Sequence, residues 1–159
     1  MVERLGREEV SPIRFREFLG GMRTLLAAIG REAVVRALEA TDTARAFVEV
    51  SGQQARFRGL SEREWLTPFG KIAMLRRTYR ADGAGSASAI PLDDACGMRG
   101  RFMTPDVEEM AVLGMAMLTG PEVEQVLGKA LPEGPSATAI QNAAHQRGEE
   151  IATRRSTIE

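Results

Sequence analysis

A segment near the C-terminus carries side chains that can read the edges of DNA bases. Its polar residues follow a glycine-containing turn, and those suited to base or phosphate contact are Ser136, Thr138, Gln141, Asn142, His145 and Arg147. Gln and Asn can make paired hydrogen bonds to adenine, Thr can contact a thymine methyl group or a phosphate, and Arg can reach guanine or the backbone. The segment therefore favours a helix that enters a major groove, although amphipathic surface helices without a ligand have a similar composition.

The spacing of apolar residues separates two faces of this segment. The predicted apolar stripe consists of Ala137, Ile140, Ala144 and Ile151. Thr138, the two amides and His145 fall on the opposite side, and Ser136 can cap the helix. A preceding helix that opens at Pro121 makes the pair a candidate helix-turn-helix. The adjacent acids Glu149 and Glu150 would repel phosphate and favour the surface-helix alternative.

Another helix is predicted to begin at Thr104-Pro105, where a capping residue precedes proline at the first helical position. Its apolar residues from Met110 to Leu118 lie on nearly all sides. That pattern is typical of a helix buried inside its own chain or against a partner. We therefore expect a homodimer in addition to double-stranded DNA as a partner.

The N-terminal part of the chain has the pattern of helix. Ser11-Pro12 is a capping pair, and apolar residues recur at helical spacing from Phe15 to Ile29. Gly20-Gly21 and Gly30 interrupt that pattern with residues of low helix propensity. Residues 11–40 are therefore predicted to form one interrupted helix or a helical pair.

The period changes to that of strands after residue 44. Turn signals at Ser51-Gly52 and at Pro68–Gly70 predict three or four antiparallel strands. The arginines in or beside them are Arg56, Arg58, Arg63, Arg76, Arg77 and Arg80. We expect these, and Arg76, Arg77 and Arg80 above all, to grip DNA phosphates. In the last strand, apolar and basic residues fall on both sides, so the sheet is not expected to be cleanly two-sided.

The elements together predict an α+β protein with a C-terminal helical bundle that contains the helix-turn-helix. Residues 1–80 are expected to form a helical segment and a small, basic antiparallel sheet. Residues 81–103 are small, rich in turn-forming types and without periodicity, which predicts a connecting loop. Residues 104–159 are expected to form the helical module.

The chain has 159 residues and a net charge of −1, but its charge is unevenly distributed. Residues 1–80 hold 15 Lys and Arg against 10 Asp and Glu, whereas residues 81–159 hold 6 against 12. A basic, arginine-rich half suits polyanion binding, or it reflects the codon bias of a G+C-rich genome. The acidic half suits a protein partner.

Several functional classes find no support in the sequence. One cysteine, Cys96, and one histidine, His145, are too few for a structural zinc site, and we expect neither metal nor cofactor. No nucleophile-base pair or nucleotide motif points to an enzyme. The uncharged run from Met110 to Leu118 is far shorter than the roughly 20 residues of a membrane span, and the N-terminus has no signal-peptide core. The expected location is the cytoplasm, in association with the nucleoid.

A series of short motifs occurs in a fixed order along the chain. They are a Thr-x-Phe-Gly turn at Thr67, Phe69 and Gly70, a strand end at Arg77, Tyr79 and Arg80, Pro91-Leu92-Asp93, Thr104-Pro105, and Pro135-Ser136. In this order they resemble the N-terminal region of bacterial insertion-sequence transposases of the ISKra type. The likeness runs from Val48 to Ala152.

The resemblance implies that this region recognises transposon-end DNA. In the full transposases a ribonuclease-H-like domain follows, whose acidic residues hold divalent metal; this chain stops at Glu159, so strand transfer is not expected of it. Some relatives carry a cysteine-rich zinc ribbon where this chain has residues 81–90, which contain no cysteine. Asp93 and Asp94 are interpreted as turn or capping residues. The alternative function is a transposase-derived module that binds a protein partner through its acidic helical half.

Overall fold

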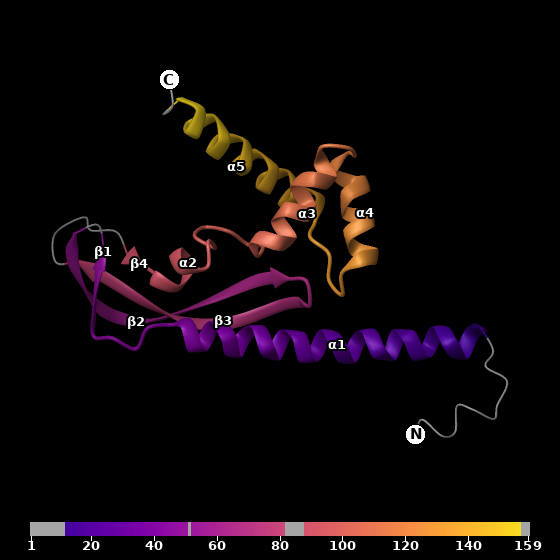
Figure 1. Cartoon of the computed structure of the whole chain (residues 1–159), viewed down its shortest axis with the longest axis horizontal. Coiled ribbons are helices and arrows are strands. Elements are labelled where there is room, and N and C mark those ends of the chain that lie inside the picture. Colours follow the sequence, from indigo (N-terminus) through magenta and orange to yellow (C-terminus); the bar gives the residue numbers. More distant parts are fainter. Residues whose placement is uncertain (1–11, 51, 82–87, 157–159) are drawn as a thin grey trace.

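The computed structural model describes residues 12–50, 52–81 and 88–156. They form an α+β fold with a long N-terminal helix, a four-stranded antiparallel sheet and a C-terminal group of helices (Figure 1). The elements are α1 Pro12–Thr41, β1 Phe47–Val50, β2 Gln53–Thr67, β3 Gly70–Ala81, β4 Ser88–Ala89, α2 Pro91–Ala95, α3 Pro105–Met115, α4 Gly120–Ala130 and α5 Ala137–Ser156. The predicted fold class is confirmed.

Helix α1 runs without a break for 30 residues, which is about 45 Å. The prediction of an interrupted helix or a helical pair is wrong; the proposed cap at Ser11 lies outside the described residues. Gly30 has a packing role, because a Cβ there would lie 2.2 Å from Cδ1 of Phe69. The neighbouring Arg31 donates a 3.0 Å hydrogen bond to the Phe69 carbonyl. Gly30 therefore marks where the β2–β3 turn approaches the helix.

The sheet has the order β1-β2-β3-β4, with all neighbouring strands antiparallel. Both predicted hairpins are confirmed, although Ser51 in the first turn lies outside the described residues. In the second turn the Thr67 hydroxyl donates to the Gly70 carbonyl at 2.7 Å and accepts from the Phe69 N–H at 3.1 Å. Gly70 has φ 103°, a conformation that favours glycine.

Strand β3 alternates cleanly between a buried and an exposed side. Ile72, Met74 and Arg76 are buried, whereas Lys71, Ala73 and Leu75 are exposed. The expectation that the sheet is not two-sided is therefore wrong along this part of β3. The core that covers the buried side consists of Leu38, Trp65, Ile72, Met74, Leu92 and Met98.

Residues 88–103 contain more regular structure than the predicted connecting loop. The part from residue 88 contains β4 and α2, while residues 82–87 lie outside the described residues. Its buried apolar residues include Leu92, Met98 and Met103. The Leu66 N–H donates to the Phe102 carbonyl at 2.8 Å, and the Thr104 N–H donates to the Leu66 carbonyl at 2.9 Å. The sequence pattern missed this packing because each contact is made with a distant segment.

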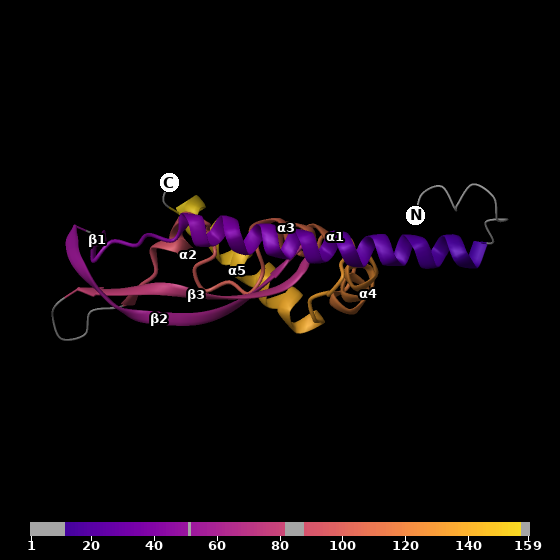
Figure 2. The same ribbon diagram turned by 90° about the horizontal axis from the view of Figure 1, so that it is seen from below.

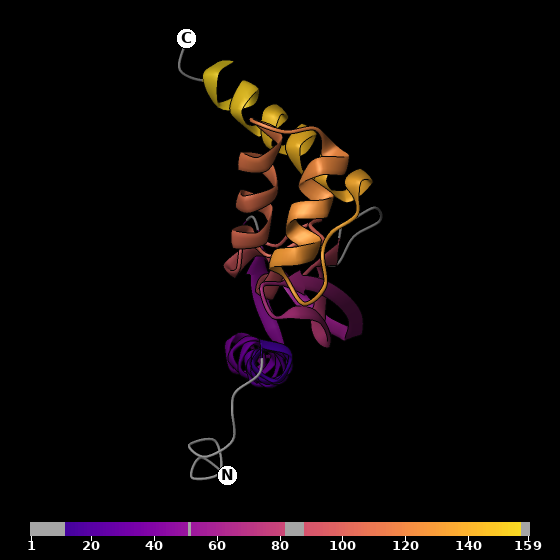
Figure 3. The ribbon, with the colours of Figure 1, turned by 90° about the vertical axis from the view of Figure 1, so that its right-hand side faces the viewer.

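Helices α3, α4 and α5 form a three-helix unit in which α5 packs across α3 and α4 (Figure 3). Its core consists of Leu66, Met103, Val107, Ala111, Val123, Leu127, Leu131, Ile140 and Ala143. Helix α3 ends at Met115. Beyond its core-facing side, Leu113 is exposed, and Met117 in the following turn is 79% exposed. Burial inside this chain therefore does not account for the apolar stretch from Met110 to Leu118.

Candidate nucleic-acid interface

The start of α5 is fixed by local hydrogen bonds. The Ala139 N–H donates to Oγ of Ser136 at 3.3 Å, and the Ile140 N–H donates to the Ser136 carbonyl at 3.0 Å. Ser136 therefore caps the helix as its sequence position predicts. Before it, the turn from Leu131 to Pro135 connects α4 to α5, and both of these turn residues are buried. The two helices thus have a fixed junction.

One side of α5 anchors the helix to the rest of the unit. Ile140 and Ala143 are buried against α3 and α4, and Ala144 is half-buried. The predicted stripe is wrong at Ile151, which is 47% exposed, because α5 runs beyond the helices that cover its first turns (Figure 1). Ala143 takes the second buried position instead. The first half of α5 is therefore held, and its last turns project into solvent.

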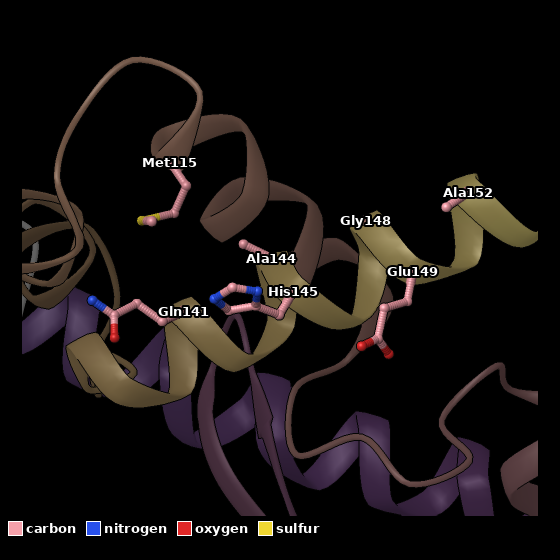
Figure 4. A pocket seen from close by; sticks show the side chains of 7 residues that line it. All are labelled: Met115, Gln141, Ala144, His145, Gly148, Glu149 and Ala152. Carbon is pink, nitrogen blue, oxygen red and sulfur yellow. The ribbon is translucent and has the colours of Figure 1, made fainter.

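The opposite side of α5 presents the predicted polar residues. Thr138, Gln141, Asn142 and His145 are all exposed, and their spacing places them on one face. Figure 4 shows Gln141 and His145 along the same side of the helix, with Glu149 one turn further on. They line an open groove whose other wall includes Met115 of α3. The structure thus brings together four of the predicted residues and adds an acidic one.

Gln141 also contacts the beginning of α4. A Cβ built on Gly120 would lie 3.1 Å from Nε2 of Gln141, so the amide rests against this glycine. Thr119 and Glu122 form a capping box here, with the Thr119 N–H donating to Glu122 at 2.8 Å. The hydrogen bonds from Thr119 lower the pKa of the Glu122 carboxyl. The ordered end of α4 therefore limits where the Gln141 amide can lie.

Arg147 does not belong to the polar face of α5. Its Nη1 donates to Glu150 at 3.1 Å, and Glu150 also pairs with Arg101, which pairs in turn with Glu108. The hydrogen bond from Arg101 to Glu108 raises the pKa of the Arg101 guanidinium above its ordinary value. This network joins the segment before α3 to α3 and α5. Arg147 itself is exposed, so its predicted contact with DNA stays a prediction.

Arg76 is a structural residue in this fold. It is 5% exposed, it forms a buried ion pair with Asp93, and its Cζ lies 5.2 Å from the centre of the Trp65 ring. The prediction that Arg76 grips phosphates is wrong, because no phosphate can reach it. Asp93 lies in the first turn of α2, but its carboxylate pairs with Arg76 of strand β3. The alternation along β3 indicated that Arg76 lies on the same side as Ile72 and Met74, whereas no local sequence pattern indicated that Asp93 is its partner.

Arg77 and Arg80 lie at the far end of β3. Nη1 of Arg77 bonds to the buried carboxylate of Asp42 at 3.2 Å, which leaves the guanidinium partly exposed. Arg80 is exposed and lies opposite Arg56 in the β2–β3 register. The sequence interpretation missed Arg45, whose only signal was its place just before β1.

A second groove lies at this end of the sheet. Arg45, Arg56 and Arg77 line it together with Phe57 and Leu60. The Tyr79 hydroxyl lies within hydrogen-bond distance of the Thr43 and Arg45 carbonyls, at 3.0 and 2.8 Å, and it holds that loop in place. Burial raises the pKa of this hydroxyl, so it keeps its proton. The groove offers positive charge beside an aromatic ring.

The two grooves are separate surfaces. Figures 1 and 2 both place the β1 end of the sheet apart from the first half of α5. Arg76 does not extend the basic charge of β3 toward α5, since it is buried. Among the described residues, the exposed polar face of α5 and the arginine-lined groove therefore lie in different parts of the fold.

Neither groove has the donor set of a metal site. Among residues 12–50, 52–81 and 88–156, no three His, Cys, Asp or Glu side chains are grouped closely enough to hold an ion. Within the same residues, no helix combines the length and apolar character needed to cross a membrane. Comparisons of the chain with protein-family models, with curated proteins and with solved structures found no match.

Proposed function

We propose that this protein binds double-stranded DNA, with α4 and α5 acting as a helix-turn-helix and α5 as the recognition helix. The observation that carries the proposal is the exposure of Thr138, Gln141, Asn142 and His145 on one face of a helix whose other face is anchored by Ile140. A reading face needs this combination, because base contacts require side chains held at a fixed position. The protein would act in the cytoplasm at the nucleoid, as a transposase-derived module without strand transfer.

The acidic residue on the same face limits the mode of contact. Glu149 follows His145 by one turn and would repel phosphates if α5 lay flat along the groove. The N-terminal turns, from Ser136 to His145, carry no acid and present the positive end of the helix dipole. Recognition helices place their N-terminal residues against the bases, so the helix enters by this end.

The arginine-lined groove supplies a second contact of a different kind. Arg45 and Arg56 are exposed there and can bind phosphates, which positions the protein without reading sequence. Binding through these residues weakens as salt rises, because each neutralised phosphate releases counterions. DNA that is bent or extended around the protein would meet both surfaces.

The test is a gel shift on duplexes selected from a random pool, repeated over a salt series. Replacing Gln141 and Asn142 by Ala removes two paired amide contacts, each worth about 1–3 kcal/mol of discrimination, and is expected to relax sequence preference. Replacing Gln53 and Gln54 by Ala removes two exposed amides from the β1–β2 hairpin and serves as the matched control. Equal preference in both variants would refute the assignment to α5.

A second candidate function is binding of a protein partner through α3 and α4. The observation that favours it is the exposure of Leu113 and Val126 on these acidic helices and of Met117 in the turn after α3. If the wild-type protein shifts no duplex even at low salt, this function replaces the first. Leu113→Ser with Met117→Ser should then weaken the partner complex and leave the fold intact.

A further inference from the structure

A row of large apolar side chains on α1 faces away from the rest of the protein. This row, the α1 stripe, consists of Phe15, Phe18, Leu19, Met22, Leu25, Leu26 and Ile29, with exposed fractions between 39% and 57%. The side of α1 that contacts the fold carries Ala27 and Gly30, which are small and buried. At 3.6 residues per turn, the two sides are turned roughly 120° from each other. Along this part of α1 the fold therefore covers the small side and leaves the large side uncovered, whereas further along the helix Leu38 is buried in the core.

The N-terminal part of α1 projects beyond the body of the protein (Figure 2). Arg23 still contacts the fold, since its Nη2 donates to the Lys129 carbonyl at the end of α4 at 2.7 Å. From Pro12 to Met22 every residue is exposed. A helix in water gains most of its stability by packing an apolar face, and a contiguous apolar patch of this kind marks an interaction site.

The α1 stripe reads the same in both directions. Counted from Met22, its members lie three, four and seven residues away on either side: Leu19 and Leu25, Phe18 and Leu26, and Phe15 and Ile29. Two copies of α1 running antiparallel about a two-fold axis at Met22 therefore place an apolar side chain opposite another along the whole stripe. Such self-complementarity is what an isologous two-fold interface requires.

Charges on one edge of the stripe favour the antiparallel arrangement. Arg14 and Glu32 are eighteen residues apart, which is five full turns, so they lie on the same edge. Their midpoint is next to Met22. In an antiparallel pair Arg14 of each copy comes beside Glu32 of the other, whereas in a parallel pair the two residues lie about 27 Å apart along the axis and cannot pair. Glu32 now bonds to Arg36 within its own helix at 2.7 Å, an exposed pair that can exchange partners.

The area of the stripe is sufficient for a dimer. Its exposed fractions correspond to roughly 600–700 Å² of apolar surface per copy, close to the ~800 Å² that each partner buries in a standard interface. We infer that the protein forms a homodimer in which two α1 helices pair antiparallel through the α1 stripe, with the two-fold axis at Met22. The inference is independent of DNA binding.

Sedimentation or light scattering over a concentration series tests the dimer. Met22→Glu places two carboxylates at the two-fold axis and is expected to raise the dimer dissociation constant at least about 100-fold. Met22→Lys should do the same, and an equimolar mixture of the two variants should restore the dimer. Leu75→Glu changes a leucine on the exposed side of the sheet and should leave the mass unchanged. A wild-type protein that stays monomeric at about 100 μM, or a Met22→Glu protein that dimerises normally, would overturn the inference.

Cysteine cross-linking tests the orientation. A mixture of Arg14→Cys and Glu32→Cys proteins should form a covalent heterodimer under mild oxidation, and Arg14→Cys alone should form none. The wild-type chain, which carries Cys96, is the control. Cross-linking of Arg14→Cys to itself, in preference to the mixture, would show a parallel pair and overturn the antiparallel arrangement. Circular dichroism confirms that each variant keeps its helix content.

Discussion

Replacing Arg76 by Met is expected to lower the free energy of unfolding by about 3–5 kcal/mol, because Asp93 would keep a buried charge without its partner. Both side chains are less than a tenth exposed, so water cannot replace the lost partner. The change also removes the cation from beside the Trp65 ring. Such a loss is a large fraction of the 5–15 kcal/mol typical of a whole domain. Urea denaturation followed by circular dichroism measures it, since fluorescence of the single tryptophan would report the substituted site itself.

Two further variants decide whether the ion pair is the cause. Arg99→Met breaks a similar contact with Asp94, the neighbour of Asp93 in α2, but there the side chains are 68% and 42% exposed, so the loss of stability should be much smaller. Replacing Arg76 by Met and Asp93 by Leu together removes both charges. This double variant should recover most of the stability, since Nε of Arg76 and Oδ1 of Asp93 have no hydrogen-bond partner among the described residues. Equal losses for Arg76→Met and Arg99→Met would refute the reasoning.

Other predictions concern helix packing and capping. Gly30→Ala should destabilise the protein by about 1–3 kcal/mol, because the new methyl group would overlap the Phe69 ring; Gly20→Ala, with open space around it, should stabilise it by about 0.5–1 kcal/mol, and thermal melts compare the two. Folding lowers the pKa of Glu122. Its contribution to the free energy of unfolding is therefore fully present above the ordinary pKa of 4.5 and is lost as the pH falls through the pKa of the folded state. Glu122→Ala should therefore differ from wild type in melting temperature at pH 7 and converge with it at pH 3. A constant difference between these two pH values would contradict the capping role.

The local part of this fold could be predicted from sequence. The turn at Pro68–Gly70 was predictable because its hydrogen bonds involve Thr67 and its immediate neighbours. Ser136 and the exposed face of α5 followed from capping and helical period for the same reason. The prediction of a helix break at Gly30 was wrong because helix propensity describes an isolated helix. In this fold the Phe69 ring occupies the space that a side chain at residue 30 would fill.

The long-range part could not be predicted. Arg76 was expected to bind phosphate, and its role depends on Asp93, seventeen positions away and brought close only by the path through β4 and α2. The ion pairs around Arg147 could not be predicted either. Its partner Glu150 also pairs with Arg101, and no helical period connects Arg101 to α5. Ile151 was placed in the stripe because the sequence does not state where the covering helices end.

Leu66 belongs to strand β2, yet its side chain lies in the core of the three-helix unit, and its backbone is held on both sides of Met103. A fragment that started at Thr104 would lack Leu66 and Met103, and the core of its three helices would contain a cavity at their positions. Because they share this core, the sheet and the three-helix unit are expected to unfold together as a single cooperative body. The shared core also fixes the position of α5 relative to the sheet.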